Sequence, residues 1–147
     1  MADSRPSVFI SSTSIDLPLY RAAVKEVILD LGMFPNGMEN WPLEGRGSVD
    51  LCKGKMDKSQ IYLGIYAHRY GWQPEKDGPS ITEMEYDWAI ARGIPCFCFI
   101  VKKDHSWPAD QIEIEAKPKL DAFKKRVKEN QVGFFTTPDD LKAQVTS

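Results

Sequence analysis

The chain has 147 residues and a formal net charge of −2, the size of one globular domain with no general attraction to nucleic acid or to an anionic membrane. Hydrophobic residues make up 42% of it, which is enough for a buried core. No apolar stretch reaches the roughly 20 residues that span a bilayer, and we expect no signal peptide in the polar N-terminus. We therefore expect one cytoplasmic domain over residues 1–147.

The N-terminal part combines a buried strand with an amphipathic helix. Residues 8–10 form a fully apolar run, typical of a strand that is buried on both faces. After a hydroxyl-rich turn, a helix begins around Asp16 and is expected to end at Gly32. Its apolar residues recur at helical spacing and are Tyr20, Val24, Val27, Ile28 and Leu31.

The middle of the chain contains two further strands. Residues 33–35 are expected to form a weak strand, followed by a loop over 36–47 and a short helix capped by Ser48. The buried face of that helix is expected to comprise Val49, Cys52 and Met56. Residues 60–67 are rich in β-branched and aromatic side chains and predict the strongest strand, before a long loop over 68–79.

The C-terminal part repeats the alternation of helix and strand. A helix over 80–92 precedes an apolar strand over 96–101, and a further helix begins at Pro118. A short strand over 132–136 leads into a last helix with Thr137 as its N-cap. This order predicts an α/β doubly wound fold, a five-stranded parallel sheet of order 2-1-3-4-5 with helices on both faces.

The three cysteines, Cys52, Cys96 and Cys98, do not have the spacing of a zinc site. Their odd number and the apolar run around the last two indicate buried, reduced thiols. We expect neither a metal nor a bound cofactor.

In a doubly wound sheet the ligand lies at the carboxyl ends of the strands where the strand order reverses, here between the first and third strands. The turn with Ser11, Ser12 and Thr13 reaches this edge and runs to Asp16 at a helix N-terminus. Such a turn can bind a phosphate, or its hydroxyls can simply cap the helix. It contains no glycine, so a P-loop is excluded.

The helix over 80–92 carries the candidate catalytic residue. Ser80 and Glu83 have the spacing of a capping box, which gives Glu83 a structural role. The apolar stripe expected to face the sheet comprises Ile81, Met84, Trp88 and Ala91. Glu85 then falls at the edge of this buried face beside the ligand edge, where it could act as a catalytic carboxylate. The alternative is a solvated surface acid.

Other candidates lie in the loops. Arg69 could bind a phosphate, pair with Glu85, or brace the loop by pairing with an aspartate. His68 could act as a base or be an ordinary loop residue. The aromatic residues Trp41, Tyr70 and Trp72 could stack on a ring or serve as packing.

Three segments together resemble the domain-of-unknown-function family that opens with an F-I-S-S-T motif. They are VFISSTSIDLPLYRAAV, SQIYLGIYAHRYGW and SITEMEYDWAIARGIPCFCFI. That family is grouped with TIR-like domains and nucleoside 2-deoxyribosyltransferases, which are flavodoxin-like and cleave N-glycosidic bonds with a helix-borne glutamate. In the transferase pattern the glutamate stands eight residues before the glycine of Gly-Lys-Pro, and Gly93-Ile94-Pro95 places Glu85 there. The lysine is replaced by Ile94, and the tyrosine of the pattern is displaced to Tyr86.

The resemblance implies a TIR-like effector domain that cleaves NAD or a related nucleotide, with Glu85 as the catalytic residue. Its nucleotide-binding residues would be Ser11, Ser12, Thr13, Asp16, Trp41, His68, Arg69, Tyr70 and Ser80. The alternatives are a non-catalytic self-association module and a deoxyribosyltransferase-like enzyme. The family usually stands at the N-terminus of longer signalling and defence proteins, so self-association and further domains are the expected partners, with no nucleic acid and no membrane.

Overall fold

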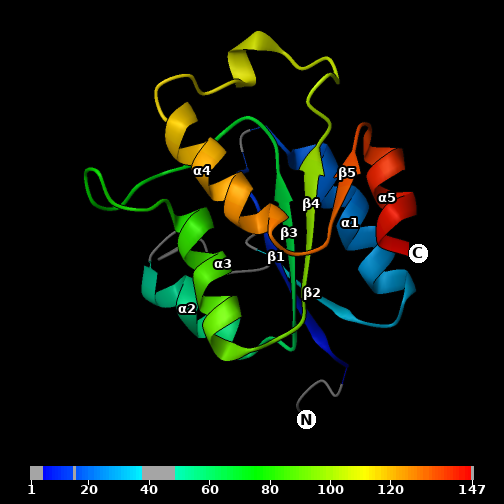
Figure 1. Ribbon diagram of the computed structural model, residues 1–147. Helices are drawn as coiled ribbons and strands as arrows, with labels where there is room; N and C mark the ends of the chain where they lie inside the picture. The colour runs from blue at the N-terminus through cyan, green and yellow to red at the C-terminus, as the bar shows by residue number, and fades with distance from the viewer. Residues whose placement is uncertain (1–4, 15, 38–48, 147) are drawn as a thin grey trace.

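A parallel sheet of five strands forms the centre of the molecule (Figure 1). The computed structural model describes residues 5–14, 16–37 and 49–146. The strands are β1 (Ser7–Ser11), β2 (Phe34–Asn36), β3 (Ile61–Tyr66), β4 (Cys96–Val101) and β5 (Val132–Phe135). Their order is β2-β1-β3-β4-β5, which confirms the predicted topology.

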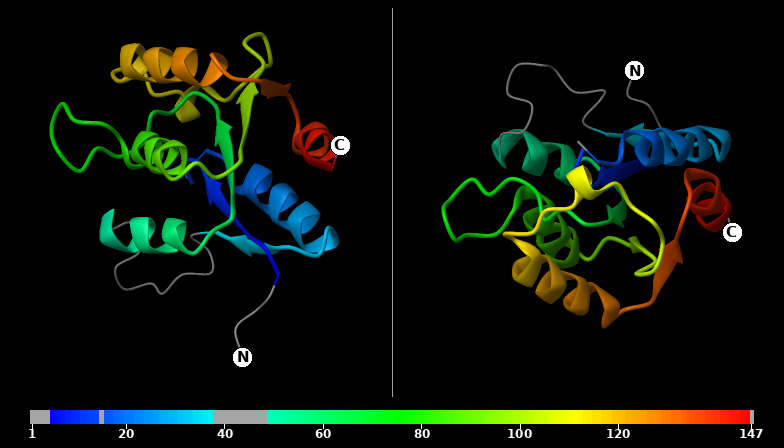
Figure 2. Two further views of the ribbon diagram at one scale, coloured as in Figure 1. Left: turned by 60° about the horizontal axis from the view of Figure 1, so that its bottom comes forward. Right: turned by 90° about the horizontal axis from the view of Figure 1, so that it is seen from above.

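Helices cover both faces of this sheet (Figure 2). They are α1 (Pro18–Asp30), α2 (Val49–Asp57), α3 (Ile81–Arg92), α4 (Lys117–Lys128) and α5 (Pro138–Thr146). Helices α1 and α5 lie on one face, and α2, α3 and α4 lie on the other. None of the helices in the described ranges combines the length and apolar character needed to cross a bilayer.

The two faces of the sheet pack into separate parts of the core because side chains alternate along each strand. On β3, Tyr62 and Tyr66 point toward α2, α3 and α4. Leu63 and Ile65 point toward α1 and α5. Strands β1 and β3 pair in parallel with Ile10 opposite Leu63, so the predicted adjacency of these two strands is confirmed. Their carboxyl ends consequently meet at one edge.

Two predictions about helix faces were wrong. Leu31 is half-exposed because α1 ends at Asp30 and Leu31 is already the C-cap. On α3 the buried residues are Thr82, Glu85, Tyr86 and Ala89. Ala91 is exposed, and Trp88 only packs at the margin of the core. The apolar stripe was misleading because α3 turns two polar residues inward and is flanked by another helix, α2, which covers part of its apolar surface.

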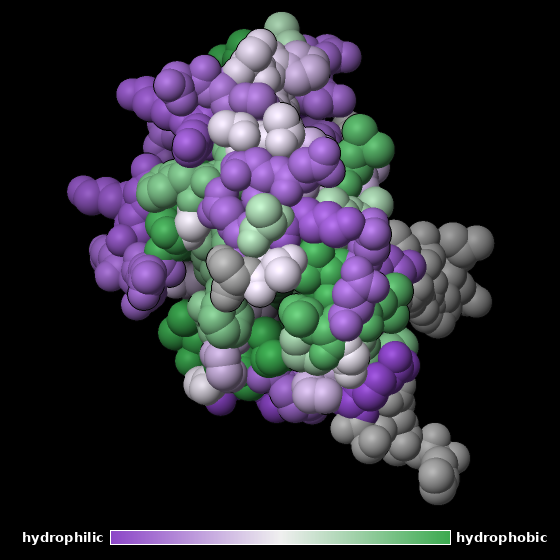
Figure 3. All heavy atoms as spheres, turned by 90° about the vertical axis from the view of Figure 1, so that its right-hand side faces the viewer, coloured by the Kyte–Doolittle hydropathy of each residue, from purple (hydrophilic) through white to green (hydrophobic). Residues whose placement is uncertain are grey.

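The outer surface mixes polar and apolar residues. Figure 3 faces the side that carries α1 and α5 and shows hydrophilic residues gathered toward the end at which the strands finish. Apolar areas lie lower on the same side. Leu29 and Leu31, at the far end of α1, are 47% and 49% exposed.

Candidate functional site

A cavity of about 470 Å³ lies at the carboxyl ends of β1 and β3. The turn after β1, the loop after β3 and the first turns of α3 form its walls, with single residues from α1 and α2. We call it the Glu85 cavity. It occupies the edge at which ligands bind in doubly wound folds.

Glu85 is a buried carboxyl group on the wall of this cavity. The Ser11 hydroxyl, at the end of β1, donates a hydrogen bond of 2.8 Å to Oε1 of Glu85. Burial raises the pKa of Glu85 to about 7, although Ser11, the charge of Arg21 and the Cys52 thiol all lower it. The expected position at the edge of the buried face is therefore corrected, because Glu85 lies within it. A carboxyl group with a pKa near 7 can serve as an acid or as a carboxylate.

Arg21 is the cation whose charge lowers the pKa of Glu85, and the sequence analysis did not identify it as a site residue. The Arg21 side chain is only 3% exposed, lines the cavity and donates a hydrogen bond of 2.8 Å to the Ser12 hydroxyl. A signal was available, since Arg21 stands between Leu17 and Val24 at the spacing of an inward-facing helical stripe. A charged residue on such a stripe is rarely buried without a polar partner.

The hydroxyl turn after β1 contributes Ser12, Thr13 and Ser14 to the cavity. The N-cap of α1 is Leu17, and no side chain caps that helix. Instead, the Thr13 hydroxyl donates to Asp16, a buried carboxylate. Burial raises the pKa of Asp16, while Thr13 and the charge of Arg69 lower it. The hydroxyls thus belong to the cavity rather than to the helix terminus.

The loop after β3 closes the opposite side with Arg69, Gly71 and Trp72. Gly71 has a φ of 99°, and an added Cβ would lie 3.1 Å from the Thr13 methyl and 3.3 Å from the Thr82 hydroxyl. Only glycine lets this loop approach so closely. Trp72 is 64% exposed and presents an aromatic surface at the opening.

A second carboxylate, Glu113, also lines the cavity, and nothing in the sequence pattern singled it out. Its side chain accepts hydrogen bonds from the backbone N–H groups of Tyr70, at 2.8 Å, and Gly71, at 3.4 Å. Glu113 also donates its own N–H to the carbonyl of His68 at 3.0 Å. These three bonds fix the loop after β3 against the segment before α4.

Several predicted site residues lie elsewhere. His68 stacks edge-on against Trp107 and lines a different cavity, and burial together with Lys124 and Lys117 lowers its pKa. Tyr70 is 3% exposed and does not line the Glu85 cavity. Ser80 is fully buried as the N-cap of α3. Trp41 lies outside the described residues.

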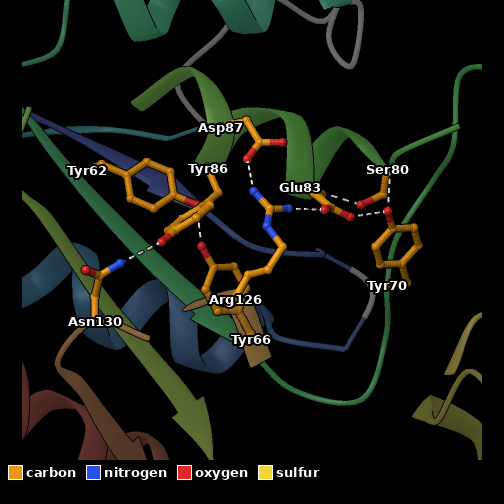
Figure 4. A network of polar contacts seen from close by, with 9 residues as sticks. All are labelled: Tyr62, Tyr66, Tyr70, Ser80, Glu83, Tyr86, Asp87, Arg126 and Asn130. Atoms are coloured by element: carbon orange, nitrogen blue, oxygen red, sulfur yellow. Dashed lines mark hydrogen bonds and ion pairs between the residues drawn. The ribbon is translucent and has the colours of Figure 1, made fainter. Parts of the chain in front are cut away.

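Tyr70 does not line the Glu85 cavity, because its side chain belongs to a network of hydrogen bonds at the start of α3 (Figure 4). Its hydroxyl donates to Glu83 and accepts a hydrogen bond of 3.1 Å from the Ser80 N–H. Arg126, on α4, bridges Glu83 and Asp87. Glu83 therefore has a structural role, although the Tyr70 hydroxyl and not Glu83 accepts from the Ser80 N–H, and the network holds α3 and α4 together.

The histidines, cysteines and acids of the described residues form no cluster of three that could hold a metal ion. The polar side chains that line the Glu85 cavity are hydroxyls, two arginines, two carboxylates and the Cys52 thiol.

The chain belongs to the family described as a domain of unknown function, DUF4062, whose model matches residues 7–147. No curated protein matches the chain. Among solved structures it is similar to a crystal structure of Era in complex with MgGDPNP and nucleotides 1506–1542 of 16S ribosomal RNA. The identity is 12% and the TM-score 0.46, over 95% of this chain and 53% of that chain, so this chain spans about half the length of the other.

Proposed function

We propose that this chain is a TIR-like effector domain that cleaves the N-glycosidic bond of NAD or a related nucleotide. The observation that carries this proposal is Glu85, a buried carboxyl group held by Ser11 on the wall of a cavity that also presents hydroxyls and arginines. The sequence motifs around Glu85 resemble those of TIR-like and deoxyribosyltransferase domains, and this resemblance also supports Glu85 as the catalytic residue.

Glu85 would act on the ribose. When the C–N bond breaks, its electron pair leaves with the base, and positive charge develops on the anomeric carbon and the ring oxygen. A carboxylate in a buried site stabilises that charge more strongly than one in water. Water then adds to the anomeric carbon and loses a proton, which gives the free ribosyl hydroxyl.

The surrounding residues match the other parts of a nucleotide. Arg69, with the hydroxyls of Ser12 and Thr13, lies where a phosphate could be bound. Trp72 at the opening offers an aromatic face for a base. In this proposal Trp72 takes the stacking role for which Trp41 and Tyr70 were candidates in the sequence.

The wider setting is also a proposal. The resemblance places such domains at the N-terminus of longer signalling and defence proteins, where cleavage of a nucleotide would be the output of a sensor. The buried, preorganised carboxyl group supports an enzyme more than a purely structural adaptor.

The test is to incubate the purified protein with NAD and to measure nicotinamide and ADP-ribose by chromatography. Glu85→Gln should lower the rate by about 10²-fold or more, the scale for a positioned catalytic side chain. Because burial raises the pKa of Glu85 to about 7, kcat/KM should rise with pH through this value if the carboxylate is the active form.

The matched control is Glu129→Gln, which makes the same chemical change at an exposed position at the end of α4. It should leave the rate within about twofold of wild type. Equal rates for wild type and Glu85→Gln would overturn the catalytic role. Absence of base release from NAD, NADP and nucleosides by concentrated protein would overturn the activity itself.

A further inference from the structure

A second cavity, of about 380 Å³, lies between α4 and the carboxyl ends of β4 and β5. Five lysines line it, and we call it the lysine cavity. They are Lys103, Lys117, Lys124, Lys125 and Lys128. The whole chain has a net charge of −2, so this gathering of positive charge is a local feature and not a consequence of composition.

Among the described residues, nearby carboxylates form an ion pair with one of these five lysines. Asp121 pairs with Lys117 at 2.9 Å. Glu113 also borders the cavity, but its Oε1 accepts from the backbone amides of Tyr70 and Gly71. Within the part of the chain that the structure describes, no carboxylate lies within 4.0 Å of the other four lysine ammonium groups.

The lysines are also close enough to act on one another. Lys124 is half-buried, and burial together with Lys128 and Lys117 lowers its pKa to about 8, while Asp121 raises it. Lys124 and Lys117 in turn lower the pKa of His68. An anion in the cavity would relieve this repulsion, because it supplies the missing opposite charge.

The cavity has an apolar side as well. Ile112 and Phe134 line it and remain 37% and 41% exposed. The Lys128 ammonium lies 6.0 Å from the centre of the Phe134 ring. Exposed apolar surface next to several ammonium groups suits a ligand with a flat organic part and more than one negative charge.

We propose that the lysine cavity binds a nucleotide through its polyphosphate group, separately from the Glu85 cavity. Glu113 borders both cavities, and its hydrogen bonds to the loop after β3 make it part of the wall between them. The ammonium groups bind phosphoryl oxygens, and Phe134 and Ile112 contact the base or sugar. This site is independent of glycosidic cleavage.

The experiment is calorimetric titration of the purified chain with ATP, with inorganic tripolyphosphate as the probe without an organic part. Lys124→Gln and Lys128→Gln should each weaken ATP binding by about tenfold to a hundredfold, the range for one charge-assisted hydrogen bond. Lys124→Arg, which retains the charge, should stay within about threefold of wild type. Tripolyphosphate should bind, but more weakly than ATP.

Two controls separate this site from general charge effects and from the Glu85 cavity. Lys53→Gln removes a charge from an exposed position on α2 and should bind ATP within about twofold of wild type. Arg69→Gln removes a cation from the Glu85 cavity, and in that background Lys128→Gln should weaken ATP binding by the same factor as in wild type. Equal weakening by Lys53→Gln, loss of the Lys128→Gln effect in the Arg69→Gln background, or unchanged binding by Lys128→Gln and Lys124→Gln would overturn the site. Tripolyphosphate binding as tight as ATP binding would overturn the nucleotide assignment.

Discussion

The burial of Glu85 lowers the stability of the fold at any pH at which this carboxyl group is ionised. Burial disfavours its charged form and raises its pKa from 4.5 to about 7, despite the hydrogen bond from Ser11. Between these two pH values the folded state binds more protons at Glu85 than the unfolded state does. The free energy of unfolding should therefore fall as pH rises from about 4.5 to about 7, by about 3 kcal/mol from this residue.

Glu85→Gln should remove this pH dependence. Glutamine can still accept the Ser11 hydrogen bond but does not ionise, so the variant should gain stability over wild type as pH rises from 5 to 8. Well below pH 4.5, where Glu85 is protonated in both states, the advantage should vanish. Urea denaturation at several pH values measures the difference, and parallel stability curves for the two proteins would contradict the proposed burial of charge.

Gly64 illustrates how one small residue makes room for a buried polar pair. One face of β3 carries every second residue of the strand, and these include Tyr62, Gly64 and Tyr66. The two tyrosine hydroxyls form a hydrogen bond with each other above the glycine. A Cβ at this position would overlap the Tyr66 hydroxyl and lie 3.0 Å from a carbon of the Tyr62 ring. Both rings are buried, so neither can move aside freely.

Gly64→Ala should lower the free energy of unfolding by about 1 to 3 kcal/mol, the usual effect of overpacking a core. The control is Gly54→Ala, within α2, where nothing lies within 4 Å of the new methyl. That change should raise stability by up to about 1 kcal/mol, because alanine favours a helix. Denaturant unfolding measures the stability of both variants. Equal effects of the two substitutions would show that Tyr62 and Tyr66 move aside to accommodate the new methyl group.

At the scale of elements, the start of α3 differs from the capping box that its sequence predicts. The Ser80 hydroxyl accepts from the Glu83 N–H at 3.1 Å, as expected. The reciprocal bond runs through Tyr70, whose hydroxyl lies between the Ser80 N–H and the Glu83 carboxylate. Tyr70 is ten residues before Ser80, so local spacing could not show that it would complete the cap.

Tyr70→Phe should lower the free energy of unfolding by about 1 to 3 kcal/mol, because it leaves the buried Ser80 N–H without its partner. Tyr86→Phe is the matched control, since that hydroxyl accepts only a long bond of 3.3 Å from the exposed Asn130. Its effect should stay below about 1 kcal/mol. Thermal or urea unfolding compares the two, and a larger effect for Tyr86→Phe would contradict the relay through Tyr70.

The same elements show why helix faces were harder to predict than helix positions. Ser80 and Gly93 mark the limits of α3, and Gly93 adopts a φ of 71° as a C-terminal glycine does. The inward side of α3 could not be obtained from apolar residues alone, because Thr82 and Glu85 face the Glu85 cavity. A helix that carries a functional site breaks the rule on which the apolar stripe depends.

At the scale of the whole molecule, topology could be predicted because it depends on few features. Continuous apolar strands that alternate with helices permit few folds other than a parallel sheet covered on both faces. The strand order predicted for such a sheet is the order found in the structure. The cavities could be predicted only in part. Ser12, Arg69 and Glu85 come from neighbouring loops and a helix at the predicted edge, whereas Glu113 reaches the same place from a distant irregular segment.

The lysine cavity shows the same limit. The amphipathic spacing of the lysines after position 116 indicates only the solvated face of a helix. The sheet brings Lys103 and Phe134 beside α4, and only this arrangement turns one helix face into the wall of a cavity. Long-range convergence of this kind leaves no local pattern in the sequence.

The proposed TIR-like function implies self-association, and the loop after β3 offers a surface for it. Trp72 is 64% exposed at the opening of the Glu85 cavity, and its carbonyl accepts the Ile81 N–H at 2.9 Å, so the loop is anchored while the indole faces outward. Exposed aromatic residues of this kind often anchor contacts between proteins. A second copy packed there would cover the cavity and shield Glu85 from bulk solvent.

We therefore expect specific activity with NAD to rise with protein concentration over a hundredfold range, and sedimentation to show self-association over the same range. Trp72→Ala should reduce both effects, whereas Leu29→Ala, which also truncates an exposed apolar side chain but at the far end of α1, should reduce neither. Sedimentation separates assembly from chemistry, because it needs no substrate. A monomer at every concentration, or equal association by Trp72→Ala and wild type, would show that the Trp72 surface does not join copies of this chain.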